Sequence, residues 1–308
     1  MQKTFTKPVS LIVFFTILAI FTVMIIGGRS AHAAQPTVNL RTASPFAILS
    51  GTPNITDAGN ASVITGNVGL SPATGAGNEL VCSQVVGTIY SVDATGPLPC
   101  RVTNGPLLLT AKNNLTTAYN DAAGRTPLTT LPTELSGTTL TAGVYDSSST
   151  TFELSAGDGD LILDGQGDPS SVFIFQAPFE GTGLIIGPGS TVTLTNGAQA
   201  CNVFWRVDSA SIDTTADFAG TILALNSISV ADAATINGRL LARNGNVTLI
   251  NDTITVSVCA GNDTGDDTPG LPNTGEMSKN FVLWGAISLL LVTSGLLLAF
   301  VAYKKRSI

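Results

Sequence analysis

Three consecutive blocks of eighteen residues between Val203 and Val256 repeat one pattern of apolar and polar positions. The blocks are 203–220, 221–238 and 239–256. Each opens with a mainly apolar pentad, continues with an alternating segment and closes with a third short segment. Three short strands in eighteen residues fit one turn of a triangular β-solenoid, in which each turn hydrogen-bonds to its neighbours about 4.7 Å away.

Earlier parts of the chain follow the same order of apolar segments with insertions between them. One set is 144–145, 151–154 and 161–163, and the next is 172–175, 184–186 and 192–194. Gly, Ser, Thr, Asn and Asp separate these short β-branched runs, as is typical of an all-β fold with many turns. We therefore predict an all-β domain over residues 35–260.

The first strand of each predicted turn is apolar on both sides, so it needs a cover on its outer side. Residues 106–123 form the one convincing helical pattern between residues 35 and 274, with Pro106 at its start and Gly124 after its end. Apolar residues recur along it at helical spacing. These first strands together form what we call the first face. We predict that this helix lies along the first face, parallel to the solenoid axis.

The second strands alternate, which predicts an outward row of small polar side chains. Ile228 and Val230 point inward, so Ser227, Ser229 and Ala231 point outward. The same reasoning places the following residues outward: Thr151, Ser209, Ser211, Asp213, Asn246, Thr248 and Ile250. The segment 246–250 is shifted by one against the strict repeat, so a bulge or an altered turn is needed there. The simpler interpretation is that solenoids in general expose small polar residues.

The N-terminal residues 1–34 have the order of a secretory signal peptide. Lys3 and Lys7 precede an apolar run from Val9 to Gly27, and Ala31-His32-Ala33 matches an A-x-A cleavage site. A retained N-terminal anchor is the alternative.

The C-terminal residues 271–308 carry a second targeting pattern. Leu271, Pro272, Asn273, Thr274 and Gly275 fit L-P-x-T-G, the uncharged stretch 281–303 is long enough to span a bilayer as a helix, and Lys304, Lys305 and Arg306 follow. This tail resembles the cell-wall sorting signal of sortase substrates. The resemblance implies cleavage between Thr274 and Gly275, transfer of the Thr274 carbonyl to peptidoglycan, and membrane contact only in the precursor. The alternative is a single-span membrane protein with a chance motif. We expect an extracellular protein of a Gram-positive cell wall, with 261–270 as a short acidic spacer.

The charge and the histidine content of the chain exclude several classes of partner and of catalytic site. Residues 35–274 hold seven Lys and Arg against twenty Asp and Glu, a formal charge of −13, which disfavours nucleic acid as a partner. The only His, His32, leaves with the signal peptide, so a Ser-His-Asp or Cys-His site is excluded from the mature chain. We expect no enzyme, no metal and no cofactor.

The four cysteines suggest disulfides in an exported protein. Three pairings are possible, and we favour Cys82–Cys100, which closes a short loop, and Cys201–Cys259, which ties the end of the domain to its middle. Zinc is a poorer explanation because no C-x-x-C pair and no mature His are present.

Several motifs in one order resemble the microbial ice-binding protein family. They are NLRTASPFAILSGTPNITDAGNASVITGNVGL (39–70), LTTAYNDAAGR (115–125), TLTAGVY (139–145), DPSSVFIFQ (168–176), NGAQACNVFW (196–205), FAGTILAL (218–225) and NGRLLAR (237–243). The resemblance covers about 38–260. It implies a right-handed triangular β-helix with one helix alongside, and a discontinuous chain order in which the N-terminal segment supplies a turn beside the C-terminal one.

The resemblance also implies ice as the partner, bound on a flat face of small side chains. Mapped onto the second strands, the candidate ice contacts are Thr56, Thr151, Ser211, Ser229 and Thr248. Asp213, Glu153 and Asp232 on or near this face, and Ile250 in place of a small residue, depart from an ideal face.

Two other functions fit parts of the pattern. A wall-attached adhesin or structural module on the same scaffold is the main alternative, although a short spacer gives it little reach. An enzyme or a calcium site is the other, because Asp158, Asp160, Asp164 and Asp168 cluster in the sequence. Their spacing does not match a calcium loop, and Asp-Gly runs are usual in solenoid turns.

Overall fold

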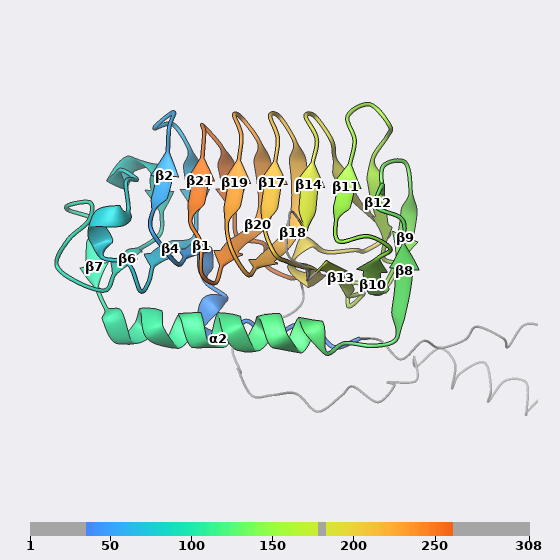
Figure 1. The fold of residues 1–308 in the computed structure, drawn as a ribbon, viewed down its shortest axis with the longest axis horizontal. Coiled ribbons are helices and arrows are strands. Elements are labelled where there is room, and N and C mark those ends of the chain that lie inside the picture. The colour runs from blue at the N-terminus through green and yellow to red at the C-terminus, as the bar shows by residue number, and fades with distance from the viewer. Residues whose placement is uncertain (1–34, 178–182, 261–308) are drawn as a thin grey trace, which may run out of the picture. The chain divides into compact units, whose positions relative to one another are not determined.

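The computed structural model describes residues 35–177 and 183–260, which form a β-solenoid with three faces of parallel strands (Figure 1). The predicted signal peptide, the motif at 271–275 and the predicted span at 281–303 lie outside the described residues. Within the described ranges, no helix is long and apolar enough to cross a membrane.

The first face carries the longest run of paired strands. In order along the solenoid they are β7 (Arg101–Thr103), β6 (Ile89–Ser91), β4 (Asn67–Leu70), β1 (Phe46–Ser50), β20 (Thr235–Ala242), β18 (Asp217–Ala224), β16 (Val203–Val207), β13 (Phe173–Ala177), β10 (Gly143–Ser147) and β8 (Leu128–Leu131).

The second face is a separate sheet of six parallel strands, seen side by side in Figure 1. They are β11 (Phe152–Leu154), β14 (Leu184–Ile186), β17 (Ala210–Ile212), β19 (Ile228–Val230), β21 (Val247–Leu249) and β2 (Ile55–Asp57).

The third face combines short strands with the first halves of β18 and β20. Its other strands are β9 (Thr139–Thr141), β12 (Leu161–Asp164), β15 (Val192–Thr195), β22 (Thr253–Thr255), β3 (Val63–Thr65) and β5 (Val85–Val86). β18 and β20 bend from the third face onto the first at Gly220 and Gly238. A Cβ at Gly238 would lie 1.8 Å from the Gly220 carbonyl oxygen, so the two turns approach this closely only with glycine. Short 3-10 helices complete the fold: η1 (Arg41–Ala43), η2 (Gly75–Gly77), η3 (Cys82–Gln84) and η4 (Ala200–Asn202).

The eighteen-residue repeat is confirmed, with two local changes of register. Ser211 pairs with Ser229 and Thr235 with Thr253 at the expected spacing of eighteen. Phe204, rather than Val203, pairs with Thr221, so the first face is offset by one residue in the first block. Ser229 pairs with Thr248, at a spacing of nineteen residues instead of eighteen. The altered turn predicted for 246–250 is present, because the loop before β21 is one residue longer and the loop after it one shorter than in the preceding turn.

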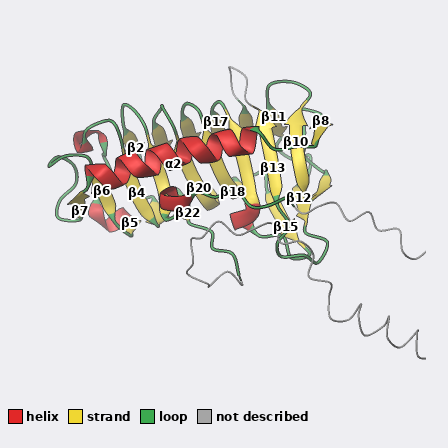
Figure 2. Cartoon of the chain, turned by 90° about the horizontal axis from the view of Figure 1, so that it is seen from below, coloured by secondary structure: helices red, strands yellow, loops and turns green. Residues whose placement is uncertain are grey.

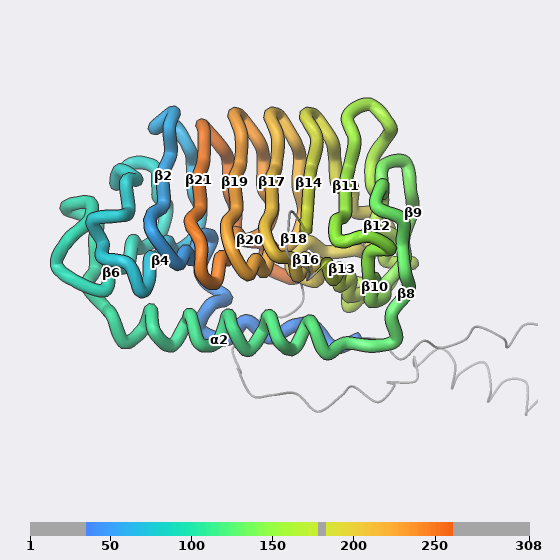
Figure 3. The backbone as a smooth tube through the Cα atoms, viewed as in Figure 1, coloured from blue at the N-terminus to red at the C-terminus, as the bar shows by residue number. Residues whose placement is uncertain are grey.

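The N-terminal segment pairs with the C-terminal turn, as the family resemblance implied. Strands β1, β2 and β3 pair in parallel with β20, β21 and β22 on the three faces. The chain then forms the end of the solenoid as far as β7, returns along its length as the helix, and builds the remaining turns back toward the junction (Figure 3). We call the contact between residues 46–65 and 240–255 the seam.

The helix α2 (Gly105–Ala123) confirms the predicted range 106–123 and covers the first face (Figure 2). The Asn104 side chain caps its start by accepting a hydrogen bond from the Leu107 amide at 3.1 Å. The buried side of α2 packs on the outward side chains of the first-face strands, including Ile174, Phe204 and Leu223, as the need for a cover predicted.

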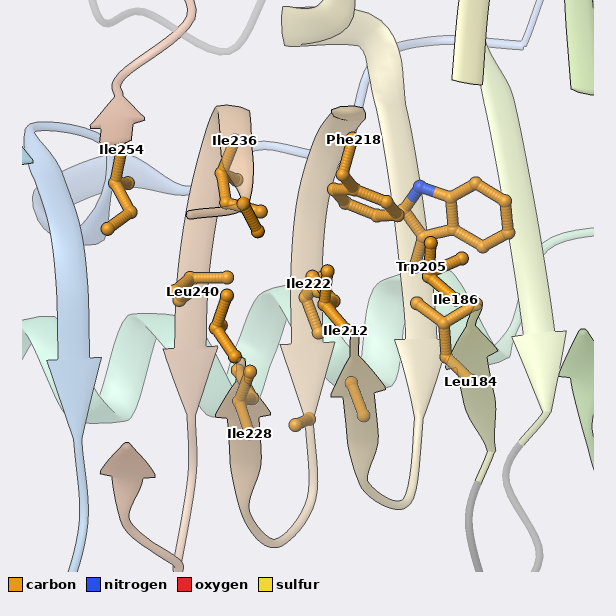
Figure 4. Packing of buried hydrophobic residues seen from close by; sticks show 14 of the residues in the cluster. Leu184, Ile186, Trp205, Ile212, Phe218, Ile222, Ile228, Ile236, Leu240 and Ile254 are labelled. Carbon is orange, nitrogen blue, oxygen red and sulfur yellow. The ribbon is translucent and has the colours of Figure 1, made fainter. Parts of the chain in front are cut away.

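A second core fills the interior of the solenoid (Figure 4). Its centre is a stack of Phe175 on Trp205, with ring centroids 3.9 Å apart and planes 9° apart, and Phe152 and Phe218 pack against the Trp205 ring. Inward residues of all three faces complete it, so each turn buries its side chains on those of the next.

Both favoured disulfides are present. Cys82–Cys100 holds the end of the solenoid, and Cys201–Cys259 joins the end of the domain to η4, which lies just before β16.

Two buried carboxylates meet at the seam. Asp252 is 1 % exposed and accepts hydrogen bonds from the amides of Ile250 and Ala234 at 2.9 and 3.0 Å. Burial raises its pKa to about 6, and the nearby charges of Asp57 and Asp232 add to this effect. Burial alone would raise the pKa of Asp57 as well, but hydrogen bonds from Ser62, Asn251 and Gly59 lower it. Asp57 therefore ionises before Asp252, and below the pKa of Asp252 it alone carries the negative charge of this pair.

We expect Asp252 to make a contribution that lowers the stability of the protein as pH rises from 3.8 to about 6, because folded Asp252 keeps a proton that the unfolded chain has released. The contribution is up to about 3 kcal/mol. Chemical denaturation across this range should show the slope in the natural chain and lose it in Asp252→Asn, which keeps an acceptor oxygen. Equal slopes in the two proteins would contradict the assignment.

Packing of α2 is tested by truncating Leu115, which is fully buried against the first face. Leu115→Ala should reduce the free energy of unfolding by about 2–5 kcal/mol through loss of buried area and the cavity left behind. Leu109→Ala is the matched control on the same helix, because Leu109 is 60 % exposed, and its effect should stay within about 0.5 kcal/mol. Similar losses in both variants would mean that the helix does not seal a core.

Candidate functional site

The outward side chains of the second face form one row across its six strands. Register pairs Thr56 with Thr248, Thr248 with Ser229, and Ser229 with Ser211. The row continues to Ile185 and ends at Glu153. Parallel strands lie about 4.7–4.9 Å apart, so these six residues, the second-face row, repeat at that interval.

The inward neighbours hold this row in place. Ile55, Val247, Ile228 and Ala210 on one side of it, and Leu249, Val230 and Ile212 on the other, are buried in the solenoid core. Because the neighbours of each outward residue are buried, the backbone of each three-residue strand is held in place. The outward side chains therefore keep fixed positions on the face. Four of the five predicted ice-contact residues, Thr56, Ser211, Ser229 and Thr248, are brought together in adjacent strands.

The hydroxyls of these four residues are left for solvent. Within the described residues, none of them makes a hydrogen bond to another protein group. Ser229 is exposed and the other three are half-buried between neighbouring strands. The four side chains carry no charge, so this part of the face presents small hydroxyl and methyl groups at regular intervals.

Thr151 lies beside the second-face row rather than in it. It precedes β11, and its carbonyl oxygen accepts hydrogen bonds from the hydroxyls of Ser147 and Ser149 at 2.6 and 3.1 Å. The central position in that strand belongs to Glu153, and Ile185 occupies the next one. The buried Leu184 and Ile186 on either side of Ile185 indicate from the sequence that Ile185 points outward, although it was not among the predicted face residues.

The residues expected to disturb the face lie mainly at its border. Asp213 is exposed just after β17 and accepts a hydrogen bond from the Thr214 amide at 2.6 Å. Asp232 accepts one from the Asn251 side chain at 2.7 Å. Ile250 follows β21 and is 37 % exposed. Glu153 is therefore the only charged member of the row itself, and it stands at the row's end.

The third face carries a second array of hydroxyl groups that the sequence interpretation missed. Strands β20, β22, β3 and β5 pair in register and turn two rows outward. The exposed side chains are Thr235, Asn237, Thr253, Thr255, Val63, Thr65 and Val86. This third-face array is bordered by Asp217 on β18. The T-x-T and V-x-T spacing of these strands in the sequence indicates that their first and third residues point to the same side.

The acidic cluster of Asp158, Asp160, Asp164 and Asp168 forms turns. Asp164 accepts hydrogen bonds from the Gln166 amide and the Asn196 side chain at 2.8 and 2.9 Å, and these two bonds lower its pKa. Asp168 accepts from the amide and hydroxyl of Ser170. Among the residues that the structure describes, no group of three or more His, Cys, Asp and Glu is arranged to hold a metal ion.

Comparison with known proteins agrees with this architecture. The family model described as ice-binding-like matches residues 48–255. The chain belongs to the ice-binding-like family. This family is non-enzymatic, so the expectation that the chain is not an enzyme is confirmed by its membership.

Relatives within the ice-binding-like family match most of the domain. The chain is 42% identical over 234 residues to an ice-binding protein of a Colwellia species, covering 75% of this chain and 88% of the relative. An ice-binding protein of Flavobacterium frigoris is 41% identical over 233 residues, covering 74% and 80%.

Solved structures of ice-binding proteins share the fold. The crystal structure of an ice-binding protein from an Antarctic biological consortium is 37% identical, with a TM-score of 0.60 over 73% of this chain and 93% of that one. The domain from ice-binding protein 1 of Shewanella frigidimarina is 28% identical, with a TM-score of 0.63 over 73% and 99%.

Proposed function

We propose that the mature chain binds ice through the second face, with Thr56, Thr248, Ser229 and Ser211 at the centre of the contact. The observation that carries this proposal is the register of these four side chains, one per strand, with hydroxyls that have no protein partner within the described residues. Membership of the ice-binding-like family supports ice as the ligand.

The mechanism follows from the regularity of the face. Each hydroxyl holds a water molecule by hydrogen bonds, and a water-mediated contact is energetically close to a direct one. Because the hydroxyls repeat at the strand interval, the waters they hold are ordered before ice arrives and merge with the lattice over the whole row. Many weak contacts then add up. Protein bound in this way pins a growing ice surface and slows growth and recrystallisation.

The far end of the row contributes less. A carboxylate such as Glu153 keeps its own hydration shell, and Ile185 offers no hydrogen-bonding group for water. The proposed contact therefore spans the four strands β17, β19, β21 and β2. The third-face array is the competing surface, but it is bordered by Asp217 and interrupted by the exposed Val63 and Val86.

We further propose that the protein acts outside the cell, attached to the wall. A signal peptide over 1–34 directs export, and sortase cleaves between Thr274 and Gly275 and joins the Thr274 carbonyl to peptidoglycan. Two disulfides in the described domain fit an oxidising compartment. The attached protein then holds the cell to ice or shapes the ice around it. A wall-attached adhesin without ice activity remains the alternative on the same scaffold.

Replacement of Ser229 by Tyr tests the face directly, because a large side chain at its centre prevents flat contact with ice. We expect Ser229→Tyr to weaken ice adsorption at least about tenfold, or roughly 1.4 kcal/mol. The measurement is the lowest protein concentration that prevents ice recrystallisation.

Thr253→Tyr is the matched control, since it places the same side chain on the third face. It should leave the activity unchanged. Loss of activity in Thr253→Tyr alone would move the site to the third-face array, and a natural chain that is folded but inactive would favour the adhesin.

A further inference from the structure

The last described residues leave the solenoid along one corner instead of starting another turn. After β22, the Ser257 carbonyl accepts a hydrogen bond from the Arg239 guanidinium at 2.9 Å. Cys259 is then joined to Cys201 of η4, and the Ala260 amide donates to the Gln199 side chain at 2.6 Å. The chain has thus crossed from β22 to the turn that contains β16.

This exit point lies at the corner opposite the second face. η4 connects β15 on the third face to β16 on the first face, so Cys201 stands where these two faces meet. In a solenoid with three faces, that corner is opposite the remaining face. A chain held by the residues beyond Ala260 therefore presents the second-face row away from its point of attachment.

The same disulfide encloses the turns that carry the proposed contact. Its cysteines are 58 residues apart, and strands β16 to β22 lie between them. Ser211, Ser229 and Thr248 are all inside this covalent loop. The enclosed segment corresponds to roughly 200 Å of extended chain.

Without the disulfide, tension on the C-terminal end would act first on β22. That strand has three residues and pairs with β20 and β3. Its removal would break the part of the seam that lies on the third face. The next strand to be pulled, β21, carries Thr248 and pairs with β2, which carries Thr56. Short strands released one after another resist force poorly, because each step breaks only a few hydrogen bonds at a time.

We propose that the Cys201–Cys259 disulfide is a mechanical clamp that transmits tension from an attached C-terminal end directly to η4 and so bypasses β22, β21 and β20. The clamp rests on the proposed attachment through the C-terminal end, because only that attachment places force on Ala260. It keeps the second-face row intact while the cell pulls on it.

The clamp is tested by pulling on single molecules of the mature chain, residues 35–274. One handle is attached at residue 274 and the other at position 229, through a click-reactive residue in place of Ser229, to imitate tension between the wall and the second face. At constant tension, Cys201→Ser/Cys259→Ser should shorten the lifetime of the folded state at least about tenfold, which is roughly 1.4 kcal/mol of barrier.

Cys82→Ser/Cys100→Ser is the matched control, since it removes the other disulfide, which lies outside the path of the tension. Its lifetime should equal that of the natural cysteine set. If Cys201→Ser/Cys259→Ser does not fold, a reductant added to the folded chain under tension makes the same comparison, and it should shorten the lifetime wherever Cys201–Cys259 is present.

Equal lifetimes with and without Cys201–Cys259 would overturn the clamp. The measurement uses no ice, so this failure is distinct from failure of the proposed ice contact. Attachment itself is tested separately, by whether the protein stays with purified cell walls when Thr274 is natural and is lost from them in Thr274→Ala.

Discussion

The pairing of residues 46–65 with residues 240–255 joins the N-terminal turns to the rest of the solenoid, and the sheets of all three faces are continuous only through it. Every other turn of the solenoid stacks on a neighbour close in the sequence, but this contact joins segments about 190 residues apart, as in the hydrogen bond from the Gly51 amide to the Gly245 carbonyl at 2.9 Å. The same contact pairs β2 with β21 and so places Thr56 beside Thr248. Because contacts between residues far apart in the sequence form slowly, we expect the seam to be a late contact in folding.

The two hydrophobic cores stabilise different parts of the structure. Inside the solenoid, aromatic side chains from successive turns stack on one another and hold the turns in register. Outside it, α2 covers strands that would otherwise expose apolar side chains, and it spans the distance between the two ends of the solenoid (Figure 2). Among the residues that the structure describes, no element covers the second face. Its short strands have room for a single central outward residue, so its chemistry is decided by six side chains.

Much of this fold was predictable because its parts are local. The repeat of 203–256 and the start and end of the helix follow from local patterns. The four cysteines left three possible pairings, and the favoured one is present. The seam was not predictable in this way, since periodicity does not indicate which distant turn is a neighbour; it came from the family resemblance. The registers of seventeen and nineteen residues depend on the lengths of corner loops, which alternation alone does not determine. For the same reason Thr151 was taken for a member of the row that Glu153 occupies, and the outward rows of the third face were not recognised.

Ice binding is proposed here as a property of the natural surface of the folded solenoid. The most direct measurement is partition of the mature chain between a slowly growing ice surface and the remaining liquid, with a similarly sized protein that does not bind ice in the same sample. If the solenoid binds ice, the chain is enriched in the ice while the reference protein is excluded. Exclusion of the folded chain to the same extent as the reference would contradict it.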